Sequence, residues 1–214
     1  MSYGTCVFCQ EIFSKVAITK HLSSCKKRSV SKEATTPLYH LVVQTRHASE
    51  FWLHLEVPIK LTLESLDDFL RDIWLECCGH LSLFRIGEET FVSYPDKTMG
   101  DRSMNISLEK IVVPGAVLAY EYDFGTTTYL TLKVLGEYRG EDSKKPRLLA
   151  RNNLSKSFCS CCKNEAKQIC IECEWDEKTT PLLCDSCAAK HEHGEEMFLP
   201  IVNSPRAGVC GYTG

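Results

Sequence analysis

The middle of the chain alternates between apolar and polar positions with two different periods. Residues 39–58 contain two alternating runs around a polar turn, which predicts a half-buried β-hairpin. Along the second run, one face of the strand would carry Phe51, Leu53, Leu55 and Val57. The opposite face would carry Trp52, His54 and Glu56. Residues 62–75 change to a helical period, which predicts an amphipathic helix behind Thr62, a residue type suited to the N-cap.

The rest of this region predicts a second hairpin, a short helix and two further strands, at residues 81–94, 107–112, 116–124 and 126–138. The hairpin would turn near Gly87, and one face of the strand that follows the short helix would carry Leu118, Tyr120, Tyr122 and Phe124. This order predicts an α+β domain over residues 37–140, a mixed sheet with one main packed helix. The order of elements is similar to that of β-grasp folds.

Thirteen cysteines stand out in a chain of 214 residues whose charged fraction, 25%, is ordinary for a globular protein. The first residues lack the basic and apolar regions of a secretory signal peptide. No stretch has the roughly 18–20 consecutive apolar residues of a membrane helix. We therefore expect a cytoplasmic protein without membrane association, whose cysteines bind metal rather than form disulfides.

The first cysteine cluster combines a Cys-x2-Cys pair with a His-x3-Cys pair. This spacing predicts one tetrahedral zinc ion bound by Cys6, Cys9, His21 and Cys25. Phe13 and Ile18 occupy the positions of the two core residues of a ββα finger. The segment resembles the two-Cys-two-His finger family, as a Cys-Cys-His-Cys variant. We expect a finger over residues 1–28 and a basic linker over residues 29–36.

Two functions stay open for this finger. A finger that reads DNA would face the groove with Ser14, Ala17 and Lys20, and phosphates would be bound by Lys20, Lys26, Lys27 and Arg28. Residues 1–36 hold six basic and two acidic side chains, a net charge of +4, whereas residues 37–150 hold twelve and seventeen, a net charge of −5. Nucleic acid would therefore contact residues 1–36 only. The alternative is a zinc-stabilised docking module with a solvated basic flank.

The second cluster consists of four ligand pairs: Cys159 and Cys162, Cys170 and Cys173, Cys184 and Cys187, His191 and His193. Pairs of this kind usually alternate, so the first and third pairs are predicted to bind one zinc ion and the second and fourth pairs another. One histidine of the last pair would lie past a helix end, since positions two apart do not share a helix face. Cys161 competes with Cys162 as a ligand.

The ligand order and the apolar residues 197–202 resemble the cross-brace modules of the B-box family. We expect a polar linker over residues 141–157, a double-zinc module over residues 158–200 and a tail over residues 201–214. Complete sets of four protein ligands are typical of structural rather than catalytic zinc.

A second resemblance covers residues 38–138. The motifs that carry it are "LEVP" (Leu55–Pro58), "FRIG" (Phe84–Gly87) and "YEYDFG" (Tyr120–Gly125). They resemble the plasmid-encoded open-reading-frame-three family, also known as insertion-element passenger proteins. The resemblance implies an association with mobile elements, and hence with nucleic acids, but it implies no reaction. The chain departs from the family pattern at residues 80–83 and 126–128, where polar groups of the family are replaced.

Candidates for catalysis are few. Glu121 and Asp123 would share the polar face of one strand, as an acid–base pair or as a solvated face and turn cap. His54 and His80 have no ligand partners in sequence. Cys77 and Cys78 are expected to be buried, inert thiols at a helix end. Cys210, between glycines, could be reactive if exposed, and Arg206 could bind an anion.

The sequence therefore predicts a non-enzymatic adaptor with three zinc ions per chain that binds a macromolecular partner, in first place a protein. One alternative is a nucleic-acid-associated protein that contacts phosphates through residues 1–36. Another is an enzyme that uses Cys210 or the region of Asp123.

Overall fold

The computed structural model describes residues 2–28, 34–174 and 181–214; residues 29–33 of the expected basic linker lie outside the described residues. The chain forms two compact units. Unit 1 comprises Met1–Asp72 and His80–Asn153, and unit 2 comprises Ile73–Gly79 and Leu154–Gly214. In the described residues, no helix has the length and apolar character needed to cross a membrane.

Unit 1 is built on a ten-stranded mixed sheet with the strand order β2-β1-β10-β4-β3-β9-β8-β5-β6-β7. Neighbouring strands are antiparallel except for β6 and β7. The strands are β1 (Tyr3–Cys6), β2 (Ile12–Ser14), β3 (Thr36–Thr45), β4 (Trp52–Pro58), β5 (Ser82–Ile86), β6 (Glu89–Val92), β7 (Arg102–Ser103), β8 (Val117–Tyr122), β9 (Thr128–Gly140) and β10 (Arg147–Asn152). The expected α+β class and both hairpins are confirmed.

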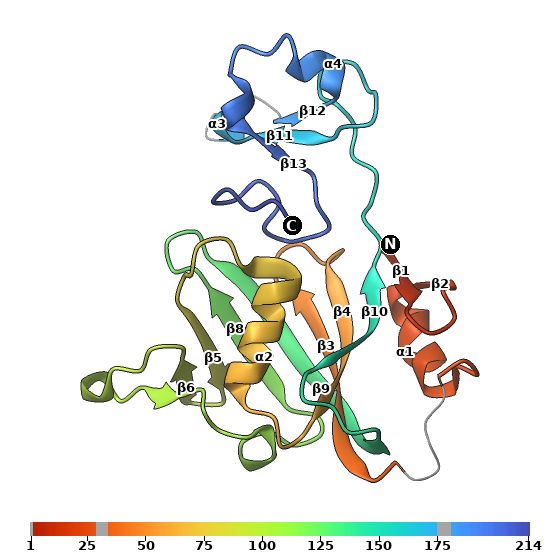
Figure 1. Cartoon of the computed structure of the whole chain (residues 1–214), viewed down its shortest axis with the longest axis vertical. Coiled ribbons are helices and arrows are strands. Elements are labelled where there is room, and N and C mark those ends of the chain that lie inside the picture. Colours follow the sequence, from red (N-terminus) through yellow and green to blue (C-terminus); the bar gives the residue numbers. More distant parts are fainter. Residues whose placement is uncertain (1, 29–33, 175–180) are drawn as a thin grey trace. The chain divides into compact units, whose positions relative to one another are not determined.

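Helix α2 (Leu63–Leu70) lies across the sheet in front of β3, β8 and β9 (Figure 1). It starts where the sequence predicts, because the Thr62 side chain accepts a hydrogen bond from the Ser65 N–H at 3.1 Å. The side chains of Leu63, Leu66 and Leu70 on this helix are buried. A π-helical turn (Arg71–Leu75) follows α2, and the predicted short helix is the 3-10 turn Leu108–Lys110.

A buried polar network holds α2 to the sheet. The Tyr120 hydroxyl donates to Asp67 Oδ1 at 2.7 Å, and Arg71 Nε donates to Asp67 Oδ2 at 2.7 Å. The guanidinium of Arg71 also donates to Ser82 Oγ at 2.8 Å. Burial, together with the charge of Asp67, raises the pKa of Tyr120 well above its ordinary value, so the phenol stays a hydrogen-bond donor.

Removing this donor tests the network. We expect Tyr120→Phe to lower the free energy of unfolding by about 1–3 kcal/mol, because a buried carboxylate loses one of its hydrogen bonds. Tyr94→Phe is the matched control: Tyr94 is 78% exposed, and its change is expected within about 0.5 kcal/mol. Urea unfolding followed by circular dichroism measures both; equal stabilities of the two variants would contradict the role of the network.

Strand β4 differs from the half-buried strand that the sequence predicts. Trp52, His54 and Glu56, on its expected polar face, are 0%, 1% and 3% exposed. The reason is tertiary, since Ile18 and Leu22 of the N-terminal segment share a core cluster with Trp52. An alternating pattern shows which residues share a face, but not what covers that face.

The segment expected as a polar linker, residues 141–157, contains β10. This strand pairs with β4 on one side and with β1 on the other. Leu149 and Ala150 are buried, which explains why six residues flanked by polar ones join the sheet. Through β1, the segment that the sequence presents as a separate finger is part of the sheet of unit 1.

The strand predicted over residues 116–124 ends earlier than expected. Leu118, Tyr120 and Tyr122 are buried on one face as predicted, but Phe124 is 50% exposed. Asp123 has φ of +64°, a left-handed conformation that takes the chain out of the strand after Tyr122. The prediction that Phe124 continues the apolar face was therefore wrong.

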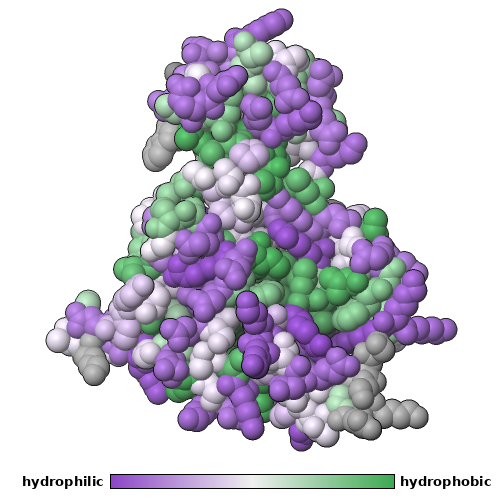
Figure 2. Space-filling model, viewed as in Figure 1, coloured by the Kyte–Doolittle hydropathy of each residue, from purple (hydrophilic) through white to green (hydrophobic). Residues whose placement is uncertain are grey.

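Unit 2 contains a small three-stranded sheet in the order β12-β11-β13. Its elements are β11 (Gln168–Cys170), α3 (Ile171–Glu174), β12 (Leu182–Leu183), α4 (Asp185–Ala188) and β13 (Phe198–Pro200). A core cluster in these elements consists of Cys170, Cys173, Leu183 and Ala188. On the face visible in Figure 2, the part of this unit that holds these elements is mainly hydrophilic. Elements this short need a further source of stability besides apolar burial.

Candidate metal centres

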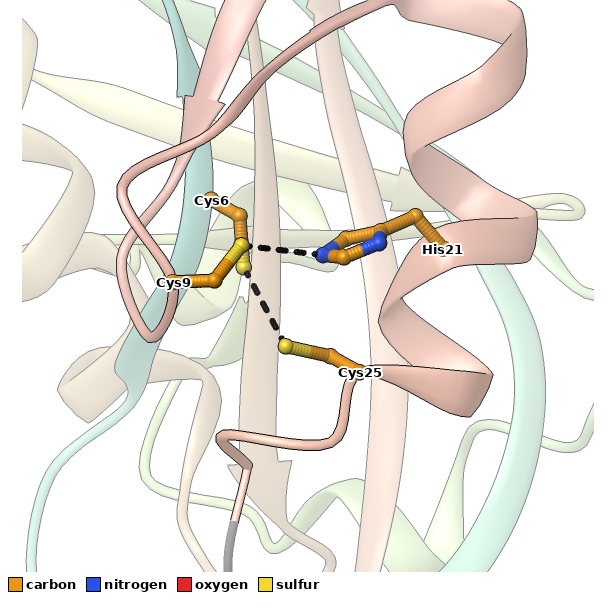
Figure 3. A group of neighbouring side chains, drawn as sticks. All are labelled: Cys6, Cys9, His21 and Cys25. Carbon is orange, nitrogen blue, oxygen red and sulfur yellow. Dashed lines mark hydrogen bonds between the residues drawn. The ribbon is translucent and has the colours of Figure 1, made fainter.

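Four side chains converge at the N-terminal end of unit 1 (Figure 3). Cys6 ends β1, Cys9 lies in the turn before β2, His21 is on α1 (Lys15–Ser24) and Cys25 is the residue that follows this helix. Cys9 Sγ lies 3.3 Å from His21 Nε2, and Cys6 Sγ lies 4.0 Å from Cys25 Sγ. All four ligand atoms lie within 4.8 Å of one another. The structure thus brings together the four residues that the spacing predicts.

Local interactions place these ligands. The Ser14 hydroxyl caps α1 by accepting from the Ala17 N–H at 3.3 Å. The Phe13 ring stacks on the His21 ring with centroids 3.9 Å apart, which orients the imidazole. Ile18 is fully buried in the cluster that also contains Cys6 and Trp52. The apolar residues that the sequence assigns to a small finger core therefore continue into the core of unit 1.

Unit 2 contains two further groups, and each joins alternate pairs of the second cluster. One consists of Cys159, Cys162, Cys184 and Cys187, with Cys162 Sγ 3.5 Å from both Cys184 Sγ and Cys187 Sγ. Backbone N–H groups of Cys184, Cys161 and Cys162 lower the pKa of the Cys159 thiol to about 6, which favours the thiolate that binds metal. Cys161 is exposed and lies outside the group.

The other group consists of Cys170, Cys173, His191 and His193. Cys173 Sγ lies 3.1 Å from His191 Nε2, and Cys170 Sγ lies 3.3 Å from His193 Nδ1. The two histidines use different ring nitrogens, which lets ligands only two positions apart reach one centre. Helix α4 ends at Ala188, so both histidines lie past the helix end, where the sequence predicts only one.

These distances suit a tetrahedral shell. With Zn–S near 2.3 Å and Zn–N near 2.05 Å, the edges of a tetrahedron are about 3.8 Å between sulfurs and about 3.6 Å between sulfur and nitrogen. The sulfur–sulfur contacts of 3.5–4.0 Å and the sulfur–nitrogen contacts of 3.1–3.4 Å lie near those edges. A disulfide would need about 2.0 Å. The Cys/His groups are therefore suited to metal of the zinc type.

The residues proposed for phosphate contact do not share one environment. Lys20, Lys26 and Lys27 are exposed. Arg28 instead pairs with Glu56 at 2.5 Å and donates to the Leu22 carbonyl at 3.1 Å. The guanidinium of Arg28 therefore interacts with groups inside unit 1. Of the four residues proposed for phosphate contact, the three lysines have exposed side chains.

His54 is a core residue. It is 1% exposed, and its Nδ1 lies 2.9 Å from Nε2 of His40. Burial lowers the pKa of His54 to about 3 and that of His40 to about 4, so both rings are neutral at physiological pH. His54 therefore packs in the core, although the sequence places it on the polar face of a half-buried hairpin.

The candidate acid–base pair is split between different partners. Glu121 pairs with Arg85 at 2.6 Å. Asp123 Oδ1 accepts from the Gly125 N–H at 3.0 Å and from the Thr126 N–H at 3.3 Å, as a turn residue does. Of the two alternatives for Asp123, a member of an acid–base pair or a turn cap, these contacts fit the turn cap.

Sequence reasoning missed a fourth group of thiols, which lies in unit 2. Cys77 and Cys78, predicted to be buried, are half-buried and exposed, respectively. Cys78 Sγ lies 3.7 Å from Cys77 Sγ and 3.7 Å from Cys210 Sγ, which is exposed. The signal in the sequence is the "CCGH" run of residues 77–80, but Cys210 lies 132 positions after Cys78.

Neither a family model nor a curated protein matches the chain. A solved structure of a protein of unknown function from Methanosarcina mazei Go1 is similar with a TM-score of 0.49 and 17% sequence identity. The match covers 55% of this chain and 70% of that chain. The resemblances to the finger, B-box and insertion-element passenger families accordingly stay predictions, whereas Cys/His groups suited to metal are present.

Proposed function

We propose that this chain is a non-enzymatic interaction protein whose modules are stabilised by structural zinc. The single observation that carries the proposal is the set of three groups that each bring four Cys/His ligand atoms within 4.8 Å of one another. In this proposal the first group is a Cys-Cys-His-Cys finger built onto the sheet. The other two form a B-box-like cross-brace, in which alternation of the ligand pairs ties the short elements of unit 2 together.

The composition of the groups supports structural rather than catalytic zinc. A catalytic zinc ion keeps one coordination position for water or substrate and is typically bound by three protein ligands. Each of these groups offers four, which fills a tetrahedral shell. Thiolate-rich shells also favour zinc over hard cations such as Mg²⁺.

A hollow in unit 1 supports a protein partner. It has a volume of about 500 Å³ and is lined by α1 on one side and by β3 and β9 on the other. Val16 of α1 is 86% exposed and Leu135 of β9 is 36% exposed, and Lys20 and Glu137 place charges of both signs along the same hollow. Apolar anchors between charges of both signs suit a protein segment better than a phosphate backbone.

Affinity capture from native cells tests this proposal. We expect one reproducible protein partner that survives nuclease treatment and is lost with Val16→Asp. Tyr94→Asp, at a residue 78% exposed and outside the hollow, is the matched control and should retain the partner. Loss of the captured material after nuclease, together with a steep salt dependence abolished by Lys20→Gln and Lys26→Gln, would favour the nucleic-acid alternative instead. If Val16→Asp and Tyr94→Asp capture the partner equally well, the hollow is not the binding site.

A further inference from the structure

The fourth group of thiols lies outside the three groups that carry the proposed function. Cys77 and Cys78 come shortly after the π-helical turn Arg71–Leu75, and Cys210 belongs to the tail of unit 2. Their sulfur atoms are separated by 3.7 Å from Cys77 to Cys78 and by 3.7 Å from Cys78 to Cys210. Both separations match the edge of about 3.8 Å expected for sulfurs that share a tetrahedral zinc ion.

The tail is held in place around this group. Ser204 Oγ donates to the Trp74 carbonyl at 2.6 Å, and Arg206 Nη2 lies 3.6 Å from Cys77 Sγ. Cys210 itself has φ of +51°, an uncommon conformation for a residue with a side chain. Such backbone strain persists only where the surroundings fix it. The turns of the tail therefore place the Cys210 thiol beside Cys78 in a defined position.

We propose that Cys77, Cys78 and Cys210 together bind a fourth zinc ion. Binding would replace three S–H protons, so that three thiolates hold Zn²⁺ and three protons are released to water. The ion would tie residues 201–214 to residues 73–79, the two segments of unit 2 that carry these cysteines. It explains why an otherwise turn-rich tail carries an exposed cysteine at a strained position.

Native mass spectrometry of the full chain, reduced and loaded with zinc, tests this inference. We expect four zinc ions on the natural protein, three on Cys210→Ser and four on Cys161→Ser, the control at an exposed cysteine outside every group. Three ions on the natural protein, unchanged by Cys210→Ser, would overturn the fourth site and leave the proposed function intact. Fewer than three ions would contradict the proposed function as well.

Alkylation of the unmodified protein provides a readout that needs no variant to fold. With zinc bound, Cys210 should react with N-ethylmaleimide at least about tenfold more slowly than Cys161, and a chelator should remove this difference. Peptide mapping by mass spectrometry assigns each modified residue. Equal reactivity of Cys161 and Cys210 in the zinc-loaded protein would overturn the site.

Discussion

Cys184→Ser will unfold the small sheet of unit 2. Cys184 is 6% exposed and belongs to the group of four thiols that spans Cys159 to Cys187. Strands of two and three residues bury only a small core of their own, so we expect the fold of these elements to depend on metal binding. A structural zinc ion contributes on the order of 10 kcal/mol of apparent binding energy, far more than the stability of so short a module.

Hydrogen exchange followed by mass spectrometry measures this prediction. In Cys184→Ser, amide protection over residues 158–200 should be lost, while protection of β3, β4 and β9 in unit 1 is retained. Cys161→Ser makes the same chemical change at an exposed thiol outside the group, and it should leave all protection unchanged. Retained protection of β11 and β13 in Cys184→Ser would show that the module folds without this centre.

The second large effect is expected at the other end of the chain. His21→Gln removes one ligand of the first group, whose cysteines Cys6 and Cys25 share a core cluster with Trp52 and Leu149. Loss of the ion would therefore loosen β1 and β10 as well as the finger. We expect a decrease of at least about 3 kcal/mol in the free energy of unfolding of unit 1.

Lys20→Gln is the control, because Lys20 precedes His21 on α1 and is exposed. Its stability should stay within about 0.5 kcal/mol of the natural protein. Urea unfolding gives both values, and hydrogen exchange should show lost protection at β1 and β10 in His21→Gln alone. If His21→Gln loosens only residues 6–25, the finger is a separate module and its integration into the sheet carries no stability.

The sequence predicts elements whose signals are local. Thr62 and the apolar spacing behind it mark α2, and Gly87, with φ of +61°, marks the turn of the hairpin formed by β5 and β6. The ligands of the first and second clusters can also be predicted from the sequence, because structural zinc sites use pairs of ligands that lie close together in the chain.

What the sequence hides depends on contacts between distant residues. Strand β10 consists of six residues among polar neighbours, and only its pairing with β1 and β4 makes it a strand. The burial of Trp52, on the expected polar face of β4, depends on Ile18 and Leu22 of the N-terminal segment, which share its core cluster. The cluster that contains Cys78 and Cys210 joins residues 132 positions apart in the sequence, a separation for which no ligand-spacing rule exists.

X-ray absorption at the zinc edge tests the central claim most directly. The three groups predicted from the sequence contain nine cysteine sulfurs and three histidine nitrogens, a ratio of three to one. In Cys210→Ser, which retains these three groups and lacks the proposed fourth site, we predict a mean shell of four ligands in that ratio, with Zn–S near 2.3 Å and Zn–N near 2.05 Å. A shell with oxygen ligands, or with fewer than four protein ligands per zinc, would contradict it.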